Sequence, residues 1–133
     1  MVRGGKFHFP ASSANTLGTM IAYLPPALFA ASWICALIGW EAPSANSSTP
    51  FDENALRWML FLGMGWSILG GSVSHTIFAK QTAKAIGWQS NGFQYEVGFA
   101  SLGIGLAGIV ASNSTDSTAW ICAALAGGIF LFL

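Results

Sequence analysis

The stretch that decides the fold is Ser74–Gly108, SHTIFAKQTAKAIGWQSNGFQYEVGFASLGIGLAG. It joins the end of one apolar run to the start of the next through a short lysine-bearing connector and a Gly-Trp turn. Two ionisable residues, His75 and Glu96, stand near the edges of these apolar runs, where a bilayer surface would fall. The pattern predicts two membrane-crossing helices that turn back at one surface.

The whole chain is too poor in charge for a surface that faces water. Only 8% of its 133 residues are charged and 53% are hydrophobic, whereas soluble domains carry about a quarter charged residues. The formal net charge is +0, which provides no basic surface for nucleic acid. We therefore expect a single integral membrane domain over residues 1–133 that contacts lipids and binds no nucleic acid.

Four apolar runs predict an all-α membrane protein with four transmembrane helices in a compact bundle. A helix needs about 20 residues to cross a hydrocarbon core of about 30 Å. The last run is shorter than that, so we expect an incomplete final span. Residues 80–88 predict a short interfacial helix between helices 2 and 3. The expected spans are about 17–40, 58–79, 95–112 and 118–133.

Lysine and arginine set the expected orientation. Most basic residues precede the first span or lie between spans two and three, and only Arg57 lies on the opposite side. By the positive-inside rule, both termini of this multi-pass protein face the cytoplasm, stroma or matrix. The two loops on the opposite side hold most of the acidic residues, Glu41, Asp52, Glu53 and Asp116.

Small residues recur at helical spacing in the second and third spans. Such stripes allow helix backbones to approach closely in a membrane, so we expect the third span to lie at the centre. Pro25 and Pro26 predict a bend in the first span. The third span carries Gly98, Ser101, Gly105, Gly108 and Ser112, and also Ala100, Gly103, Ala107 and Ala111; the second carries Gly63, Ser67, Gly70 or Gly71, and Ser74.

His75 and Glu96 form the candidate site, because an ionisable pair within a membrane is a functional hypothesis by default. Glu96 lies in the first turn of the third span, where the helix dipole favours an anion. A tight hairpin would bring the two side chains within hydrogen-bond reach. In a structural alternative, Glu96 holds the connector and His75 joins two helices. We favour that alternative, because ionisable groups are far less costly at the interface than at the bilayer centre.

Three functional hypotheses stand beside the structural one. In the first, His75 is the single axial metal ligand of a planar cofactor, a chlorophyll or a haem; a carotenoid or a lipid is a further candidate ligand. In the second, His75 and Glu96 pass protons or ions in a small transporter or channel, although no other ionisable residue lies at mid-depth. In the third, His8, His75 and Glu96 bind a metal ion.

The leading expectation for function is a non-enzymatic accessory or structural subunit of a larger membrane complex, in contact with other membrane-protein subunits. The small-residue stripes and the apolar end of the last run offer helix-packing surface. No motif for nucleophilic catalysis occurs in the sequence, so we expect no enzyme.

Three blocks carry a family resemblance: His75-Thr-Ile-Phe-Ala, Ile86-Gly-Trp, and Phe93-Gln-Tyr-Glu-Val-Gly-Phe-Ala-Ser-Leu. They resemble a family of small, mainly prokaryotic, multi-pass membrane proteins of unknown function. The likeness covers about residues 58–112 and does not include the first span or its loop. It implies four helices, a longer fourth span and no particular activity. It also directs interest to His75, Trp88, Gln94 and Glu96, which are our candidate cofactor-binding residues.

Overall fold

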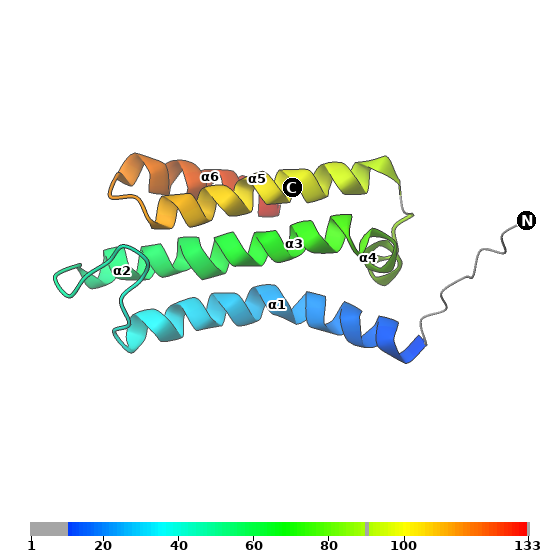
Figure 1. Ribbon diagram of the computed structural model, residues 1–133, viewed down its shortest axis with the longest axis horizontal. Coiled ribbons are helices and arrows are strands. Elements are labelled where there is room, and N and C mark those ends of the chain that lie inside the picture. Colours follow the sequence, from blue (N-terminus) through cyan, green and yellow to red (C-terminus); the bar gives the residue numbers. More distant parts are fainter. Residues whose placement is uncertain (1–10, 90, 133) are drawn as a thin grey trace, which may run out of the picture.

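The described backbone consists of helices joined by turns and loops, the longest of which is residues 38–50. The computed structural model describes residues 11–89 and 91–132, without the side chains of residues 11–18, 20 and 21. No strand occurs in these residues, which confirms the all-α expectation. The elements are α1 (Ala11–Leu37), α2 (Phe51–Trp58), the π-helical η1 (Met59–Trp66), α3 (Ser67–Thr76), α4 (Ala79–Ile86), α5 (Gly92–Ser112) and α6 (Ser117–Phe132) (Figure 1).

One uninterrupted helical stretch, residues 51–76, lies in the middle of the molecule and comprises α2, η1 and α3 (Figure 1). It packs against α1 on one side and against α5 and α6 on the other. Within the described residues, α1 contacts neither α5 nor α6. We expected the third span to be central; the 51–76 helix has that place instead, because both of its sides are packed.

The 51–76 helix and α5 approach most closely at glycines. A Cβ atom added to Gly65 would stand 2.7 Å from Cγ1 of Ile109. A Cβ atom added to Gly108 would stand 2.9 Å from the carbonyl oxygen of Leu60. Both distances are shorter than real Cβ contacts, so this crossing depends on residues without a side chain.

The small-residue stripes do not all face the core. The first stripe of α5, Gly98, Ser101, Gly105, Gly108 and Ser112, is buried as expected. In the second stripe Ala111 is buried, whereas Ala100, Gly103 and Ala107 are exposed. The 51–76 helix turns Gly63 and Gly70 toward α1, where a Cβ on Gly70 would stand 2.6 Å from Cδ2 of Leu24. Gly63 and Gly70 of the second span therefore pack against α1, whereas the first stripe of α5 packs against the 51–76 helix.

Two local predictions agree with the backbone. α1 contains Pro25 and Pro26 and bends along its length (Figure 1), as expected when two amide donors are missing from a helix. The connector forms the short helix α4, and Gly87 follows it with φ 77°. α4 is seen end-on in Figure 1, so it lies across the ends of the long helices.

Length and composition single out one helix in the described part of the chain. α5, with 21 residues, is long and apolar enough to cross a membrane. α6 is apolar but has only 16 residues.

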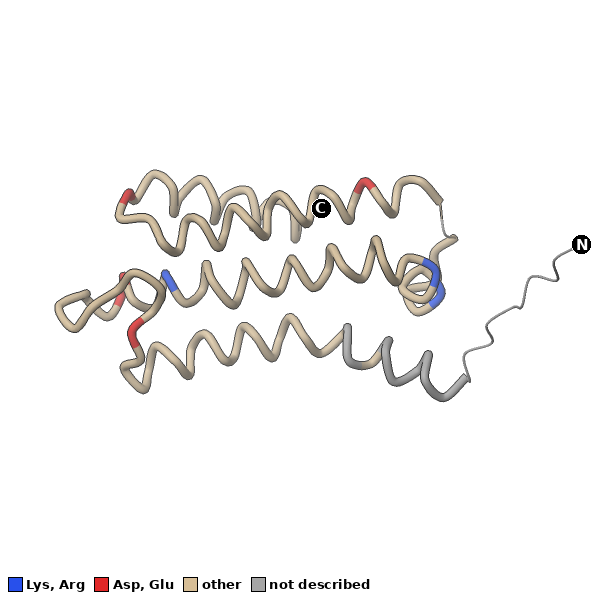
Figure 2. Tube along the Cα trace, viewed as in Figure 1, with Lys and Arg blue, Asp and Glu red and all other residues tan. Residues whose placement is uncertain are grey.

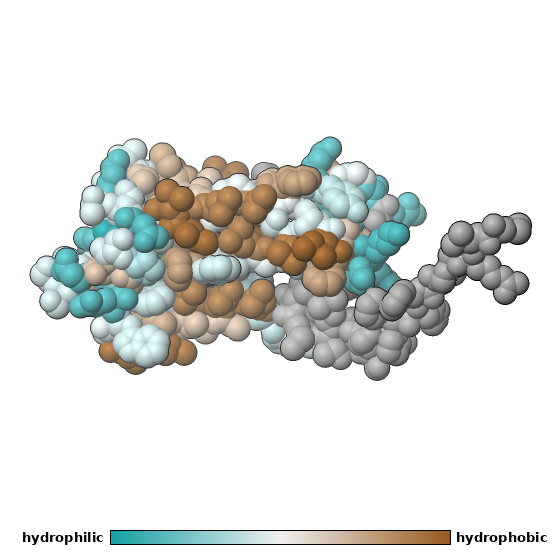
Figure 3. All heavy atoms as spheres, in the orientation of Figure 1, coloured by the Kyte–Doolittle hydropathy of each residue, from teal (hydrophilic) through white to brown (hydrophobic). Residues whose placement is uncertain are grey.

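Charged residues gather at the two ends of the long helices (Figure 2). Lys80 and Lys84 lie on α4 at one end, and the acidic residues of α2 and of the loops lie at the other. Glu96, the acidic residue of α5, is nearer to the lysine end. On the face shown in Figure 3, apolar side chains occupy the middle and hydrophilic side chains occupy both ends.

Candidate functional site

The candidate site lies where α3, α4 and α5 meet. Thr82 on α4 donates its hydroxyl proton to the carbonyl of Ser74 on α3 at 2.8 Å. The backbone N–H of Trp88 donates to the carbonyl of Ala83 at 2.8 Å and closes the end of α4. Because Gly87 adopts a left-handed backbone that most residues avoid, the chain turns sharply there. The turn presents the indole of Trp88 beside α3 and α5.

His75 is half-buried at the end of α3. Its ring centroid lies 6.3 Å from that of Trp88, at an interplanar angle of 41°. Its Nδ1 atom is buried and has no hydrogen-bond partner. A histidine that binds a metal almost always has its other ring nitrogen hydrogen-bonded, and Nδ1 makes no such bond here. A Cβ on Gly98 would stand 3.4 Å from the Cβ of His75, so α5 packs directly against this turn of α3.

Gln94 holds the start of α5 against the start of α4. Its side chain is buried, with 1% of the residue surface exposed. The amide Nε2 donates to the carbonyl of Ala79 at 2.6 Å, whereas Oε1 has no partner. This hydrogen bond fixes the connector, and the candidate role of Gln94 in binding a cofactor stays a prediction.

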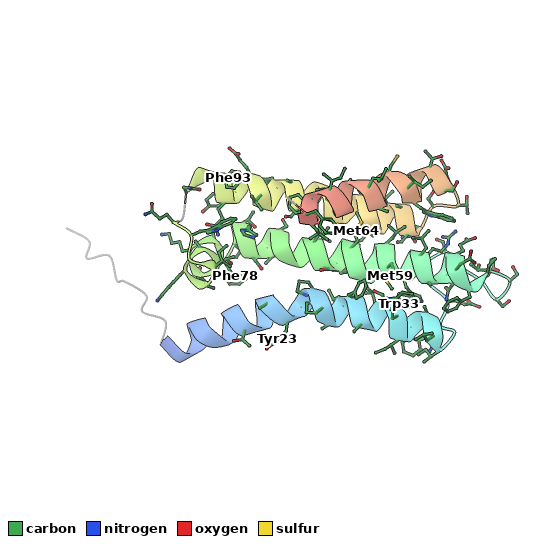
Figure 4. All side chains as sticks on the ribbon, turned by 180° about the vertical axis from the view of Figure 1, so that it is seen from behind. Tyr23, Trp33, Met59, Met64, Phe78 and Phe93 are labelled. Atoms are coloured by element: carbon green, nitrogen blue, oxygen red, sulfur yellow. The ribbon has the colours of Figure 1, made fainter. Side chains whose placement is uncertain are left out.

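Glu96 is exposed and lines a groove of about 530 Å³ between α5 and the end of α6, here called the α5–α6 groove. Figure 4 shows Phe93, which also lines the groove, at the start of α5 and Phe78 at the α3–α4 turn, at the same end of the molecule. The groove is lined by Trp88, Phe93, Glu96, Val97 and Ala100, and by Phe130 and Leu131 of α6.

His75 and Glu96 do not form the expected pair. No hydrogen bond or ion pair joins these two described side chains. His75 packs against α5 at Gly98, and Glu96 stands two residues earlier, on the other side of the same helix. Of the four candidate residues, His75 is half-buried, Gln94 is buried and Glu96 lines the groove, while Trp88 contacts His75 and also lines the groove.

The hypothesis of a metal ion bound by His8, His75 and Glu96 involves a residue outside the described part of the chain, His8. Within residues 11–89 and 91–132, no three histidine, cysteine, aspartate or glutamate side chains lie close enough to hold a metal ion together.

At the opposite end of the molecule, Arg57 is buried and contacts several helices, a role that the sequence did not predict. Arg57 is 1% exposed, and its Nη2 lies 2.8 Å from Oε1 of Glu53. Its Nη1 donates to the carbonyl of Ser112 at 3.0 Å, and its guanidinium lies 5.0 Å from the ring centroid of Trp120. Arg57 therefore joins α2 to the end of α5 and to α6. Glu53 and Arg57 are four residues apart in the sequence, a spacing from which this ion pair could have been inferred.

Several groove residues also escaped the sequence interpretation. Phe93 and Val97 are four residues apart on α5, so they share a face that could have been inferred from helical spacing. Phe130 and Leu131 come from α6, and no sequence pattern indicates which part of α5 they approach.

These features define a small all-helical protein with an aromatic groove at one end and a buried arginine at the other. The chain belongs to the family of unknown function DUF6790, whose model matches residues 22–133. This match is wider than the resemblance over residues 58–112, since it also takes in most of α1 and the loop that follows. The chain matches no curated protein and no solved structure.

Proposed function

We propose that this chain is a non-enzymatic integral membrane protein that serves as an accessory or structural subunit of a larger membrane complex and binds lipid. In this proposal α1, the 51–76 helix, α5 and α6 each cross the bilayer. α4 lies in the interface, and both termini face the cytoplasm or an equivalent compartment.

The distribution of exposed side chains is the observation that carries the proposal. Large apolar side chains point outward along the long helices, among them Phe99 and Val110 on α5 and Ile121 and Ile129 on α6. Soluble monomers rarely expose apolar patches larger than a few hundred Å². Lipid tails cover such side chains at no cost, so an apolar middle between two hydrophilic ends favours a bilayer.

The 51–76 helix is a second candidate for crossing the bilayer. Its helical backbone is continuous, although the π-helical η1 separates the α-helical segments α2 and α3. Residues 58–76 continue without a break in the helical backbone, and His75 is their only ionisable residue. At 1.5 Å per residue, such a segment extends about 28 Å, close to the thickness of the hydrocarbon core. α1 and α6 run beside it on either side (Figure 1).

The placement of lysine and arginine supports the orientation. Arg57 is the one basic residue at the acidic end among the described residues. At the other end α4 exposes two, Lys80 and Lys84. The positive-inside rule then places α4 on the cytoplasmic side.

The outer face of α5 supports a role in assembly. Gly103 and Ala107 follow one another along this exposed face. A Cβ added to Gly103 would meet nothing within 4 Å, so the backbone there is open to another helix. Small residues of this kind allow close helix contacts in membranes.

Cysteine labelling tests the membrane topology. In a Cys35→Ala/Cys122→Ala background, Ser47→Cys places a thiol in the loop after α1, and Gln89→Cys places one after α4. We expect an impermeant maleimide to label only the first thiol in intact cells and both after lysis. Recovery of the protein without detergent, or equal labelling of both sites in intact cells, would contradict the proposed insertion.

Native mass spectrometry of gently solubilised protein tests the role in assembly. We expect a complex larger than the monomer, which Gly103→Trp disrupts because the new side chain fills the open face of α5. Ala85→Trp, on the exposed surface of α4, is the matched control and should leave the complex intact. A protein that is only monomeric in mild detergent would refute the subunit role.

Two other hypotheses from the sequence stay predictions. A visible absorption spectrum of the solubilised protein tests whether His75 binds a chlorophyll or a haem. Flux measurements in liposomes test transport through His75 and Glu96. Flux that survives His75→Ala and Glu96→Gln together would reject that route.

A further inference from the structure

The α5–α6 groove contains one charged group, and that group has no counter-ion. Glu96 makes no hydrogen bond and no ion pair with any described residue. Lys80 and Lys84 lie at the same end of the molecule, yet neither is within ion-pair distance of this carboxylate. Because a carboxylate beside apolar side chains is stabilised by a cation, the groove is suited to a positively charged group supplied from outside the chain.

Two aromatic rings beside Glu96 define which kind of cation fits. The ring centroids of Trp88 and Phe93 lie 6.5 Å apart, and the ring planes are inclined by 46°. Both residues line the groove and both are more than half exposed, at 51% and 57%. Inclined aromatic faces attract ammonium groups through their quadrupoles, and tryptophan is the strongest of them. Two rings and one carboxylate therefore favour an organic ammonium group.

The rest of the groove is apolar and extends along the helix. Val97 and Ala100 lie on α5 beyond Glu96, and Phe130 and Leu131 face them from α6. From Phe93 to Ala100 the helix rises about 10 Å, away from the lysine end and toward the apolar middle. A ligand with an ammonium head and a hydrocarbon tail would follow this direction in the same way as a lipid in the surrounding leaflet.

We infer that the α5–α6 groove binds phosphatidylethanolamine, with its ammonium group at Glu96, Trp88 and Phe93 and one acyl chain along Val97 and Ala100. A primary ammonium donates charge-assisted hydrogen bonds to a carboxylate. The quaternary ammonium of phosphatidylcholine has no proton to donate, so the carboxylate discriminates between the two lipids. This inference rests on the proposed membrane location and adds a specific ligand to it.

The test measures lipid retention by native mass spectrometry after incubation with phosphatidylethanolamine, phosphatidylcholine or phosphatidylglycerol of equal chain length. We expect the wild-type protein to retain phosphatidylethanolamine about tenfold better than phosphatidylcholine, since one charge-assisted hydrogen bond separates them. Glu96→Gln should remove that preference. Glu41→Gln, which neutralises an exposed carboxylate in the loop after α1, should keep it.

A second variant tests the apolar part of the groove independently of the charge. Ala100 is exposed, so Ala100→Phe is expected to fold, and its ring should fill the groove and reduce retention of all three lipids. Circular dichroism checks that each variant keeps the helical content of the wild type.

Three results would overturn the inference: equal retention of the three lipids by the wild type, an unchanged preference in Glu96→Gln, or the same loss in Glu41→Gln. A carbodiimide cross-link from Glu96 to a lysine of another protein would also overturn it, because the cation would then belong to a protein partner. If the cysteine-labelling pattern holds while the lipid preference is absent, this inference fails and the proposed function stands. If the labelling pattern fails, the proposed function is wrong.

Discussion

Removing Glu53 is expected to destabilise the fold more than removing a typical surface carboxylate. Arg57 is 1% exposed, so Glu53→Ala leaves a buried guanidinium without its anion. Breaking a buried ion pair by removing one partner costs about 3–5 kcal/mol. The side chain of Glu53 is 31% exposed, and Arg57 keeps its contacts with the Ser112 carbonyl and the Trp120 ring. We therefore expect a smaller loss of about 2–3 kcal/mol in the free energy of unfolding.

The double variant separates the buried charge from ordinary packing. Arg57→Met removes the cation and fills much of its volume, so we expect a loss of about 1–2 kcal/mol from the missing hydrogen bonds and ring contact. Once Arg57 is absent, Glu53 has no partner, and Glu53→Ala/Arg57→Met should be about as stable as Arg57→Met alone. The two single losses would then fail to add by about 2–3 kcal/mol.

The free energies come from circular dichroism of the detergent-solubilised protein during titration with sodium dodecyl sulfate. Tryptophan fluorescence, which reports the average surroundings of the six tryptophans, provides a second measure of unfolding in the same titration. Glu41→Ala, at an exposed position in the loop after α1, is the matched control and should change stability by less than about 0.5 kcal/mol. The reasoning is refuted if Glu53→Ala costs no more than this control, or if the losses of the two single variants simply add.

Three further predictions concern helix packing and the ends of the helices. Gly108→Ala should lose about 1–3 kcal/mol in the same titration, because its Cβ would stand 2.9 Å from a backbone oxygen; Gly103→Ala, which meets open space, should lose nothing. Gln94→Ala should lose about 1–3 kcal/mol, since it removes the hydrogen bond between α5 and α4; wild-type stability would exclude that role. Asn54→Ala removes two hydrogen bonds of 2.8 Å to the loop after α1, so amide hydrogen exchange in residues 38–50 should become faster. Unchanged exchange there would show that the loop is held in another way.

Local patterns accounted for most of the helical segments. Apolar runs, the two prolines and the Gly87-Trp88 turn each depend on a few consecutive residues, and the structure has α1, the 51–76 helix, α4, α5 and α6 at those places. The first small-residue stripe of α5 was also predicted correctly, because its spacing of three and four residues places it on one face.

The candidate site was predicted less completely. The sequence placed His75 and Glu96 at the same end, but the rotation of α5 about its axis directs Gly98 toward His75 and Glu96 into the groove. The structure shows the amide of Gln94 bound to the Ala79 carbonyl, a contact that the sequence did not predict, and cofactor binding by Gln94 stays a prediction. Which residues of α5 face α3, α4 or the groove depends on the rotation of the helix about its axis, and a single sequence does not specify that rotation.

The sequence by itself determined the helical segments, the separation of lysines from acidic residues, and a composition that favours lipid as the solvent. These properties follow from the spacing and number of residues along one chain. Only the tertiary structure decided that the 51–76 helix is central, that Arg57 is buried against α5 and α6, and that α6 completes a groove beside Glu96. The reason is that burial and pairing depend on which faces of different helices meet, and those contacts join residues far apart in the sequence.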